Sequence, residues 1–303
     1  MIAMAELSNK STLEETTDEA PALASHSGLL FLAWKGAGNE NLNVAYSEDD
    51  GASFRTKVSY SDTSDRAPAL VSIYGGPLAI AWKGAGNENL NVAAVPLFSG
   101  GIGDGLSEKT TFDESSGDAP SLGRWGSSVA LGWRGAGNDN LNVALLDGLH
   151  SIYQKATFPT TSDRAPALSV VYTALCVAWR DDVSSIICVA ATRGQLGTER
   201  DELERASVVA HSSHEDHTQR TDLSPALTDH ENHAVVAFKG AGNDNLNVMR
   251  HIDPGGTPHS YWEGSPLEET SDRTPAVTSH NGRLVIAWKG SGNENLNVAT
   301  VVL

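Results

Sequence analysis

The chain has 303 residues and a formal net charge of −17. An acidic surface repels phosphate groups, which excludes nucleic acid as a partner and disfavours attachment to an anionic membrane. No apolar run approaches the roughly 20 residues that a membrane-spanning helix needs. Because residues 1–10 lack the pattern of a signal peptide and only two cysteines are present, we expect a cytoplasmic protein, with leaderless secretion left open.

The first strand-turn-strand cassette predicts three strands in chain order. An Ala-Pro-Ala-Leu segment at residues 20–23 opens the first strand, with proline at its start, where a missing hydrogen-bond donor is tolerated. An apolar second strand ends at Trp34, and Gly-Ala-Gly-Asn at residues 36–39 then forms a hairpin. Residues 41–45 form the third strand, and a more polar stretch supplies the fourth.

This cassette recurs along the whole sequence, with an aromatic residue at the end of each second strand and a valine ten residues later. The six pairs are Trp34 and Val44, Trp82 and Val92, Trp133 and Val143, Trp179 and Val189, Phe238 and Val248, and Trp288 and Val298. The aromatic residues are 46 to 59 positions apart, about the length of one four-stranded propeller blade. The repeat predicts an all-β fold in which residues 1–303 form a single six-bladed β-propeller of antiparallel blades.

The two ends of the sequence fit this count. The last cassette stops at Leu303, just after its third strand. Residues 6–13 precede the first strand of the first blade and occupy the slot of a fourth strand. We therefore expect the N-terminal strand to complete the last blade and to close the ring, which leaves no open sheet edge.

The segment after the first blade's third strand carries a family resemblance. Residues 47–54, Ser-Glu-Asp-Asp-Gly-Ala-Ser-Phe, have the pattern Ser-x-Asp-x-Gly-x-x-aromatic. This resembles the Asp-box, or bacterial neuraminidase repeat, of the propellers of sialidases and related lectins. The resemblance implies a six-bladed propeller with the box in the turn between strands three and four. It also implies a structural role, so we expect Ser47 and Asp49 to bond the turn backbone.

One face of the predicted ring gathers the most repeated polar motifs. Strands alternate in direction, so the loop before each first strand and the hairpin between strands two and three lie on the same face, called the top face here. Ligands of closed β-architectures usually bind at such loop-built mouths. The position just before Ala-Pro reads Glu19, Arg66, Asp118, Arg164, Leu223 and Arg273 around the ring.

This ring has two interpretations. Arg66, Arg164 and Arg273 could form a clamp for a carboxylate or phosphate. Alternatively, Glu19 and Asp118 could pair with them and tie neighbouring blades together. Leu223 breaks the alternation of charge and leaves two arginines short of an acidic partner each.

The top-face hairpin gives a second set of candidates, made of asparagines and of the aromatic residues before them. The asparagines could hydrogen-bond a sugar and the tryptophans could stack on it, or both could serve the turn and the core instead. The candidate asparagines are Asn39, Asn87, Asn138, Asn243 and Asn293, and the candidate tryptophans are Trp34, Trp82, Trp133 and Trp288.

The fourth blade departs from the repeat. Its hairpin lacks the glycines and asparagines, and residues 194–205 add length that we expect on the opposite, bottom face. His211, His214 and His217 then follow near the top face. Their spacing matches no strong metal motif, so we predict neither a metal site nor a cofactor.

These patterns predict a lectin-like carbohydrate-binding propeller with repeated loop sites, whose partner is a glycan or a small acidic ligand. The alternative is an enzyme with one central pocket, either a sialidase-like glycoside hydrolase acting on an acidic sugar or a cofactor-free cyclase or isomerase. The resemblance transfers no catalytic residue, because the arginines occupy one repeated position and no tyrosine lies in a recognisable motif. A protein-interaction platform is a third interpretation, and the sequence leaves the oligomeric state open.

Overall fold

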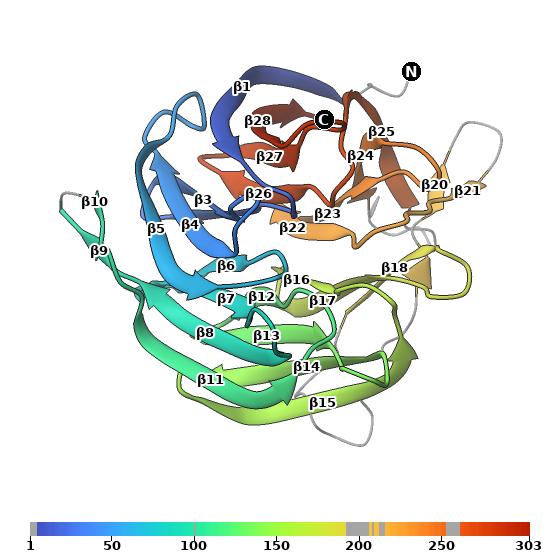
Figure 1. The fold of residues 1–303 in the computed structure, drawn as a ribbon. Helices are drawn as coiled ribbons and strands as arrows, with labels where there is room; N and C mark the ends of the chain where they lie inside the picture. The colour runs from blue at the N-terminus through green and yellow to red at the C-terminus, as the bar shows by residue number, and fades with distance from the viewer. Residues whose placement is uncertain (1–4, 100, 192–205, 208, 212–215, 253–260) are drawn as a thin grey trace.

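The computed structural model describes residues 5–99, 101–191, 206–207, 209–211, 216–252 and 261–303. Within these ranges the strands form six large sheets arranged in a ring, each built on four antiparallel strands, which confirms the predicted six-bladed β-propeller (Figure 1). The same ranges hold no helix with the length and apolarity that crossing a membrane requires.

The first three blades consist of consecutive strands, with the innermost strand first. Blade 1 contains β2 (Ala22–His26), β3 (Leu29–Lys35), β4 (Asn41–Ser47) and β5 (Arg55–Thr63). Blade 2 contains β6 (Ala69–Ser72), β7 (Leu78–Lys83), β8 (Asn89–Val95) and β11 (Ser107–Ser115), with a small hairpin of β9 (Leu97–Phe98) and β10 (Gly101–Ile102). Blade 3 contains β12 (Ser121–Trp125), β13 (Ser128–Arg134), β14 (Asn140–Asp147) and β15 (Ser151–Thr161).

The other three blades are less uniform. Blade 4 contains β16 (Ala167–Val171), β17 (Ala174–Arg180), β18 (Ile187–Ala191) and the short β19 (Ala206–Ser207). Blade 5 contains β22 (Ala226–His230), β23 (His233–Lys239), β24 (Asn245–Ile252) and β25 (Tyr261–Thr270), and is extended by β20 (Val209–His211) and β21 (Asp216–Thr218). Blade 6 contains β26 (Ala276–His280), β27 (Arg283–Lys289), β28 (Asn295–Val302) and β1 (Glu6–Thr16).

The N-terminal strand closes the ring as predicted. Strand β1 runs antiparallel to β28, with Leu7 opposite Val301 and Thr12 opposite Asn297, and the two strands lie side by side in Figure 1. The strand is longer than the expected residues 6–13, since it continues to Thr16. Pairing the two ends of the sequence in one blade covers an edge of that sheet that would otherwise be open.

The core lies between the blades, because the second and third strands of each blade are apolar on both faces. Strand β3, for example, is buried from Leu30 to Lys35. The hairpin that follows needs two glycines for different reasons. Gly38 has a φ of +68°, in the left-handed region, whereas a Cβ on Gly36 would lie 2.6 Å from the Asn39 side-chain oxygen.

Residues 47–54 lie in the turn between β4 and β5, as the sialidase resemblance implies. The Ser47 hydroxyl accepts a hydrogen bond from the Gly51 backbone N–H at 2.8 Å, and the Asp49 carboxylate accepts one from the Ser53 backbone N–H at 2.8 Å. The two side chains therefore bond the turn backbone, which is the structural role expected of them.

Two predicted features of blade 4 fall largely outside the described residues. These are the insertion at 194–205 and the histidine segment at 211–217, of which the structure describes only backbone strand at 211 and 216–217. The predicted bottom-face and top-face placements of these segments stay predictions.

Candidate functional site

A cavity of about 470 Å³ lies at the centre of the ring, where the six innermost strands begin. The loop before each of these strands contributes to its wall, including all six residues of the predicted ring position. Backbone hydrogen bonds join these loops to the hairpins, as in Ser64 N–H to Glu40 O at 2.8 Å and Thr17 N–H to Glu294 O at 2.9 Å. The two repeated polar motifs therefore do share one face.

In five of the six blades, an ion pair between a largely buried cation and a partly exposed aspartate anchors the loop. In each pair, the cation that follows the core aromatic residue reaches the aspartate just before the ring position. The pairs are Lys35 with Asp18 at 2.6 Å, Lys83 with Asp65 at 2.9 Å, Lys239 with Asp222 at 3.1 Å, Lys289 with Asp272 at 2.8 Å, and Arg180 with Asp163. Sequence reasoning missed this pairing, although both members recur at constant positions in the cassette.

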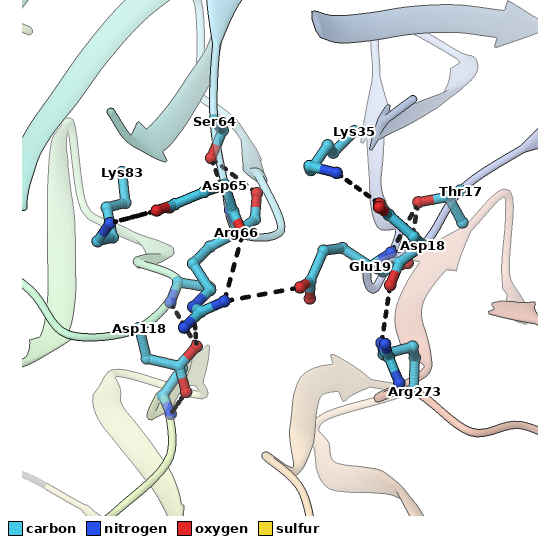
Figure 2. Close-up of polar contacts among 12 residues, drawn as sticks. Thr17, Asp18, Glu19, Lys35, Ser64, Asp65, Arg66, Lys83, Asp118 and Arg273 are labelled. Carbon is cyan, nitrogen blue, oxygen red and sulfur yellow. Dashed lines mark hydrogen bonds and ion pairs between the residues drawn. The ribbon is translucent and has the colours of Figure 1, made fainter. Parts of the chain in front are cut away.

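Arg66 lies between the two acids of the ring. Its Nη1 is 3.9 Å from a Glu19 carboxyl oxygen, and its Nε is 3.7 Å from Asp118 Oδ1. Figure 2 shows Glu19 and Asp118 directed toward the Arg66 guanidinium from two sides. Both distances are longer than hydrogen bonds, so the three groups attract one another without being locked together.

The other two ring arginines bind backbone carbonyls instead of carboxylates. Arg164 Nε donates to the Asp222 carbonyl at 3.1 Å, and Arg273 Nε donates to the Asp18 carbonyl at 2.8 Å. Among the described residues, neither guanidinium forms an ion pair with a carboxylate. The predicted ring of alternating ion pairs therefore holds around Arg66, while the gap at Leu223 leaves Arg164 with a carbonyl partner.

Glu19 is the cavity carboxyl group whose ionisation the surroundings oppose. Burial raises the pKa of the Glu19 carboxyl above its usual 4.5, although the nearby Arg273 and Arg66 guanidinium groups act to lower it. Desolvation penalises the charged form of an acid, and this penalty outweighs the attraction of the two arginines for the Glu19 carboxylate.

Asp118 is held in one orientation by backbone donors. Its Oδ1 accepts a hydrogen bond from the Ala119 N–H at 2.8 Å, and its Oδ2 accepts one from the Ala165 N–H at 3.1 Å. Since Ala165 lies just before β16, the first strand of the next blade, the carboxylate also bridges blades 3 and 4.

The hairpin asparagines are exposed, but their side chains serve the turn. In each of the five blades the Oδ1 atom accepts a hydrogen bond from the backbone N–H two residues later, at 2.9 to 3.1 Å; the residues are Asn39, Asn87, Asn138, Asn243 and Asn293. This is the turn chemistry that the sequence offered as the alternative to sugar binding.

The candidate tryptophans lie between blades, at the core. Trp34, Trp82, Trp133 and Trp288 are at most 1% exposed. A lysine from an outer strand covers the ring in each case, as Lys57 does at 5.6 Å from the Trp34 centroid. Their rings cannot stack on a sugar from this position, so burial favours the packing role over the stacking role.

One further cavity residue was absent from the sequence-based candidates. Arg134, at the end of β13, lines the cavity and pairs with Asp139 at 2.8 Å. The signal was present in the cassette alignment, because blade 3 has Gly117 where the other five blades have the anchoring aspartate.

Comparison with known proteins yields similar folds and no sequence relative. No protein-family model matches the chain, and no curated protein matches it by sequence. Among solved structures, the GH93 α-L-arabinofuranosidase of Fusarium graminearum in complex with arabinobiose is similar over 97% of this chain and 98% of that one, with a TM-score of 0.64 and 11% identity. The α-L-arabinanase of Penicillium chrysogenum complexed with arabinobiose matches over 96% and 98%, with a TM-score of 0.62 and 12% identity.

Sialidases share the architecture too. The sialidase of Trypanosoma rangeli matches over 96% of this chain and 59% of its own length, with a TM-score of 0.56 and 14% identity. The likeness to a sialidase propeller that the sequence suggested is thus confirmed at the level of fold. At these identities the similarity establishes the fold alone.

Proposed function

We propose that the chain is a glycoside hydrolase that acts on an acidic sugar in the central cavity. The observation that carries the proposal is the arrangement of two carboxyl groups on either side of Arg66. Glu19 has a raised pKa, and Asp118 is fixed by two backbone donors. Glycoside hydrolysis uses such a pair, in which one group donates a proton and the other acts as a carboxylate.

In this reaction Glu19 is the acid. Its carboxyl proton passes to the glycosidic oxygen as the bond between that oxygen and the anomeric carbon breaks. Asp118 either attacks the anomeric carbon or takes a proton from the attacking water. The separation of the two carboxyl groups around a bound sugar decides between these two courses.

The substrate class follows from the arginines in the cavity wall. Arg66, Arg134, Arg164 and Arg273 line the cavity of a protein whose overall charge is −17. Guanidinium groups bind carboxylates with paired, charge-assisted hydrogen bonds. A sugar that carries a carboxylate therefore fits the cavity better than a neutral sugar does.

The comparisons support the enzyme over the lectin-like interpretation. The similar structures are an arabinofuranosidase, an arabinanase and sialidases, and two of them hold arabinobiose. Residues 47–54 fit the same picture, and we infer that they are a single Asp-box of the kind found in sialidase propellers.

Replacement of the proposed acid tests the function. A panel of aryl glycosides should include sialosides, glucuronides and neutral arabinofuranosides. With the substrate that is cleaved, we expect Glu19→Gln to lower kcat by about 100-fold or more, the usual contribution of a general acid. Glu40→Gln, at an exposed hairpin acid, is the matched control and should keep the wild-type rate. An unchanged rate for Glu19→Gln would contradict the role of Glu19.

A non-catalytic glycan-binding module is the second candidate. The observation in its favour is the set of five exposed hairpins with the same Asn-[Glu/Asp]-Asn sequence around one face. It predicts several equivalent weak sites and a gain from avidity, whereas the hydrolase predicts one site.

A further inference from the structure

Blade 3 lacks the ion pair that anchors the loops of the other five blades. Its loop reads Ser116-Gly117-Asp118, so glycine stands where the other blades have aspartate. The cation at the end of its second strand, Arg134, consequently has no loop carboxylate to bind. Its Nη1 instead pairs with Asp139 of the hairpin, at 2.8 Å.

Gly117 provides space rather than an unusual backbone conformation. Its φ lies outside the left-handed region that favours glycine. A Cβ at this position would lie 2.0 Å from Arg134 Nη2, far inside any permitted contact. The guanidinium therefore occupies the place that the side chain of the missing aspartate would fill, and it does so in the wall of the cavity.

Blade 4 offers a direct comparison, because Arg180 occupies the equivalent position to Arg134. All three nitrogens of the Arg180 guanidinium have acceptors: Nε donates to the Thr221 carbonyl at 2.9 Å, Nη2 donates to the Ser185 hydroxyl at 2.6 Å, and Nη1 pairs with Asp163. The Arg134 side chain is 18% exposed, and its Nε is buried without an acceptor among the described residues. A buried donor without a partner is rare in a native protein, so the Arg134 guanidinium is less fully bonded to the protein than that of Arg180.

We propose that Arg134 is a specificity-determining residue that binds the carboxylate of a sugar in the central cavity, in place of the loop aspartate that blade 3 has lost. This inference rests on the proposed function and assigns its acidic-sugar selectivity to one residue. The Arg134 side chain reaches the cavity and is 18% exposed, and a guanidinium fork suits paired hydrogen bonds to a carboxylate.

Restoring the aspartate tests the inference with little change to the fold. In Gly117→Asp the new carboxylate binds Arg134 as Asp163 binds Arg180 in blade 4, so the ligand loses its partner. A second variant, Gly117→Asp with Arg134→Lys, rebuilds the Lys–Asp pair of four other blades if the first one folds poorly. Arg180→Lys in blade 4, which keeps its Asp163 partner, is the matched control.

Calorimetric titration with methyl glucuronide, N-acetylneuraminate and neutral methyl glucoside gives the readout. We expect wild type and Arg180→Lys to bind a carboxylate sugar. The two variants that carry Gly117→Asp should lose about tenfold or more of that affinity while affinity for the neutral sugar stays unchanged. Equal loss for neutral and acidic sugars, affinity within about twofold of wild type, or no binding of either acidic sugar by wild type would each overturn the assignment.

The outcome is separable from that of the proposed function. Hydrolysis is measured independently, with Glu19→Gln. Carboxylate binding that depends on Arg134 in a chain that hydrolyses nothing would leave the inference standing and remove the hydrolase. Hydrolysis that depends on Glu19, with an unchanged preference for acidic sugars in Gly117→Asp, would leave the hydrolase standing and remove the inference about Arg134.

Discussion

At the scale of single residues, one loop position performs different tasks in different blades. Arg66 attracts two acids, whereas Arg164 and Arg273 each hold a carbonyl of the following blade. Glu19, at the same position in blade 1, is buried enough that its pKa is raised. The six loop positions are equivalent in the backbone but carry different side chains, and these differences give the nearly symmetric ring one asymmetric site.

The raised pKa of Glu19 predicts a cost to stability. A group whose pKa is higher in the folded than in the unfolded state adds stability below the unfolded value, here 4.5, and loses it as pH rises through the folded value. At pH 7, above the unfolded value, the raised pKa of Glu19 therefore costs stability, and glutamine at this position would not carry that cost. We expect Glu19→Gln to unfold at a higher temperature than wild type at pH 7, with a difference that shrinks toward pH 4.5.

Thermal unfolding followed by circular dichroism across that pH range is the measurement. Glu40→Gln, at an exposed carboxylate, provides the baseline. A Glu19→Gln variant that is less stable than wild type at neutral pH would show that the Glu19 carboxylate stabilises the fold, against this account. Residues kept for function at a cost in stability are common in active sites.

At the scale of elements, the bottom ends of three innermost strands carry a histidine that sequence reasoning overlooked. His26 ends β2, His230 ends β22 and His280 ends β26. Each ring bonds a serine of an adjacent blade: Ser72, Ser279 and Ser25, at 2.9, 3.0 and 2.9 Å. The three links run from blade 5 through blades 6 and 1 to blade 2.

These histidines predict that the ring loosens in mild acid. Burial lowers the pKa of all three below the usual 6.5, although Asp50 beside His280 and Glu231 near His230 oppose the shift. Below that value the unfolded chain takes up protons that the folded chain resists, so the free energy of unfolding falls as pH drops. We expect His26→Gln, which can still bond Ser72, to weaken this dependence.

Denaturant unfolding at a series of pH values between about 7.5 and 5 checks the expectation. His150 is largely exposed, with 64% of its side chain accessible, and His150→Gln is the control that should keep the wild-type slope. A free energy of unfolding that stays constant over this range would mean that the three histidines titrate alike in the folded and unfolded chains.

Outer strands link neighbouring blades through a lysine that lies over a core tryptophan and pairs with an acid of the preceding blade. Lys155 of β15 shows both contacts: it lies 5.2 Å from the Trp133 ring centroid and 2.6 Å from Glu114 of β11. Lys10, Lys57 and Lys109 repeat the arrangement. This packing role accounts for the recurrence of the four tryptophans, because each ring supports a lysine that links two blades.

At the scale of the molecule, the cassette length and its apolar strands were enough to predict the ring, its six blades and its N-terminal closure. The ring, the blade number and the closure all follow from a local sequence pattern that repeats six times along the chain. The shared face of the two polar motifs followed from strand alternation alone. The continuation of β1 to Thr16 lay beyond the pattern, because it depends on pairing with β28.

The candidate site was predicted in part. Glu19, Arg66 and Asp118 do meet in one cavity, because one position in each repeat must face the axis. The chemistry of these groups needed three-dimensional information. The pKa of Glu19 depends on how deeply its carboxyl group is buried. The position of the Arg134 guanidinium depends on the space that Gly117 leaves by lacking a side chain. A comparison of the six loops would have revealed Gly117, since it alone replaces the aspartate.

The stoichiometry of ligand binding separates a single central site from a ring of repeated hairpin sites most directly. Calorimetric titration of the whole chain with the acidic sugar that it binds should give one ligand per chain, and Glu19→Gln should keep that number while hydrolysis is lost. A value near five, matching the five Asn-[Glu/Asp]-Asn hairpins, would contradict the central cavity as the site.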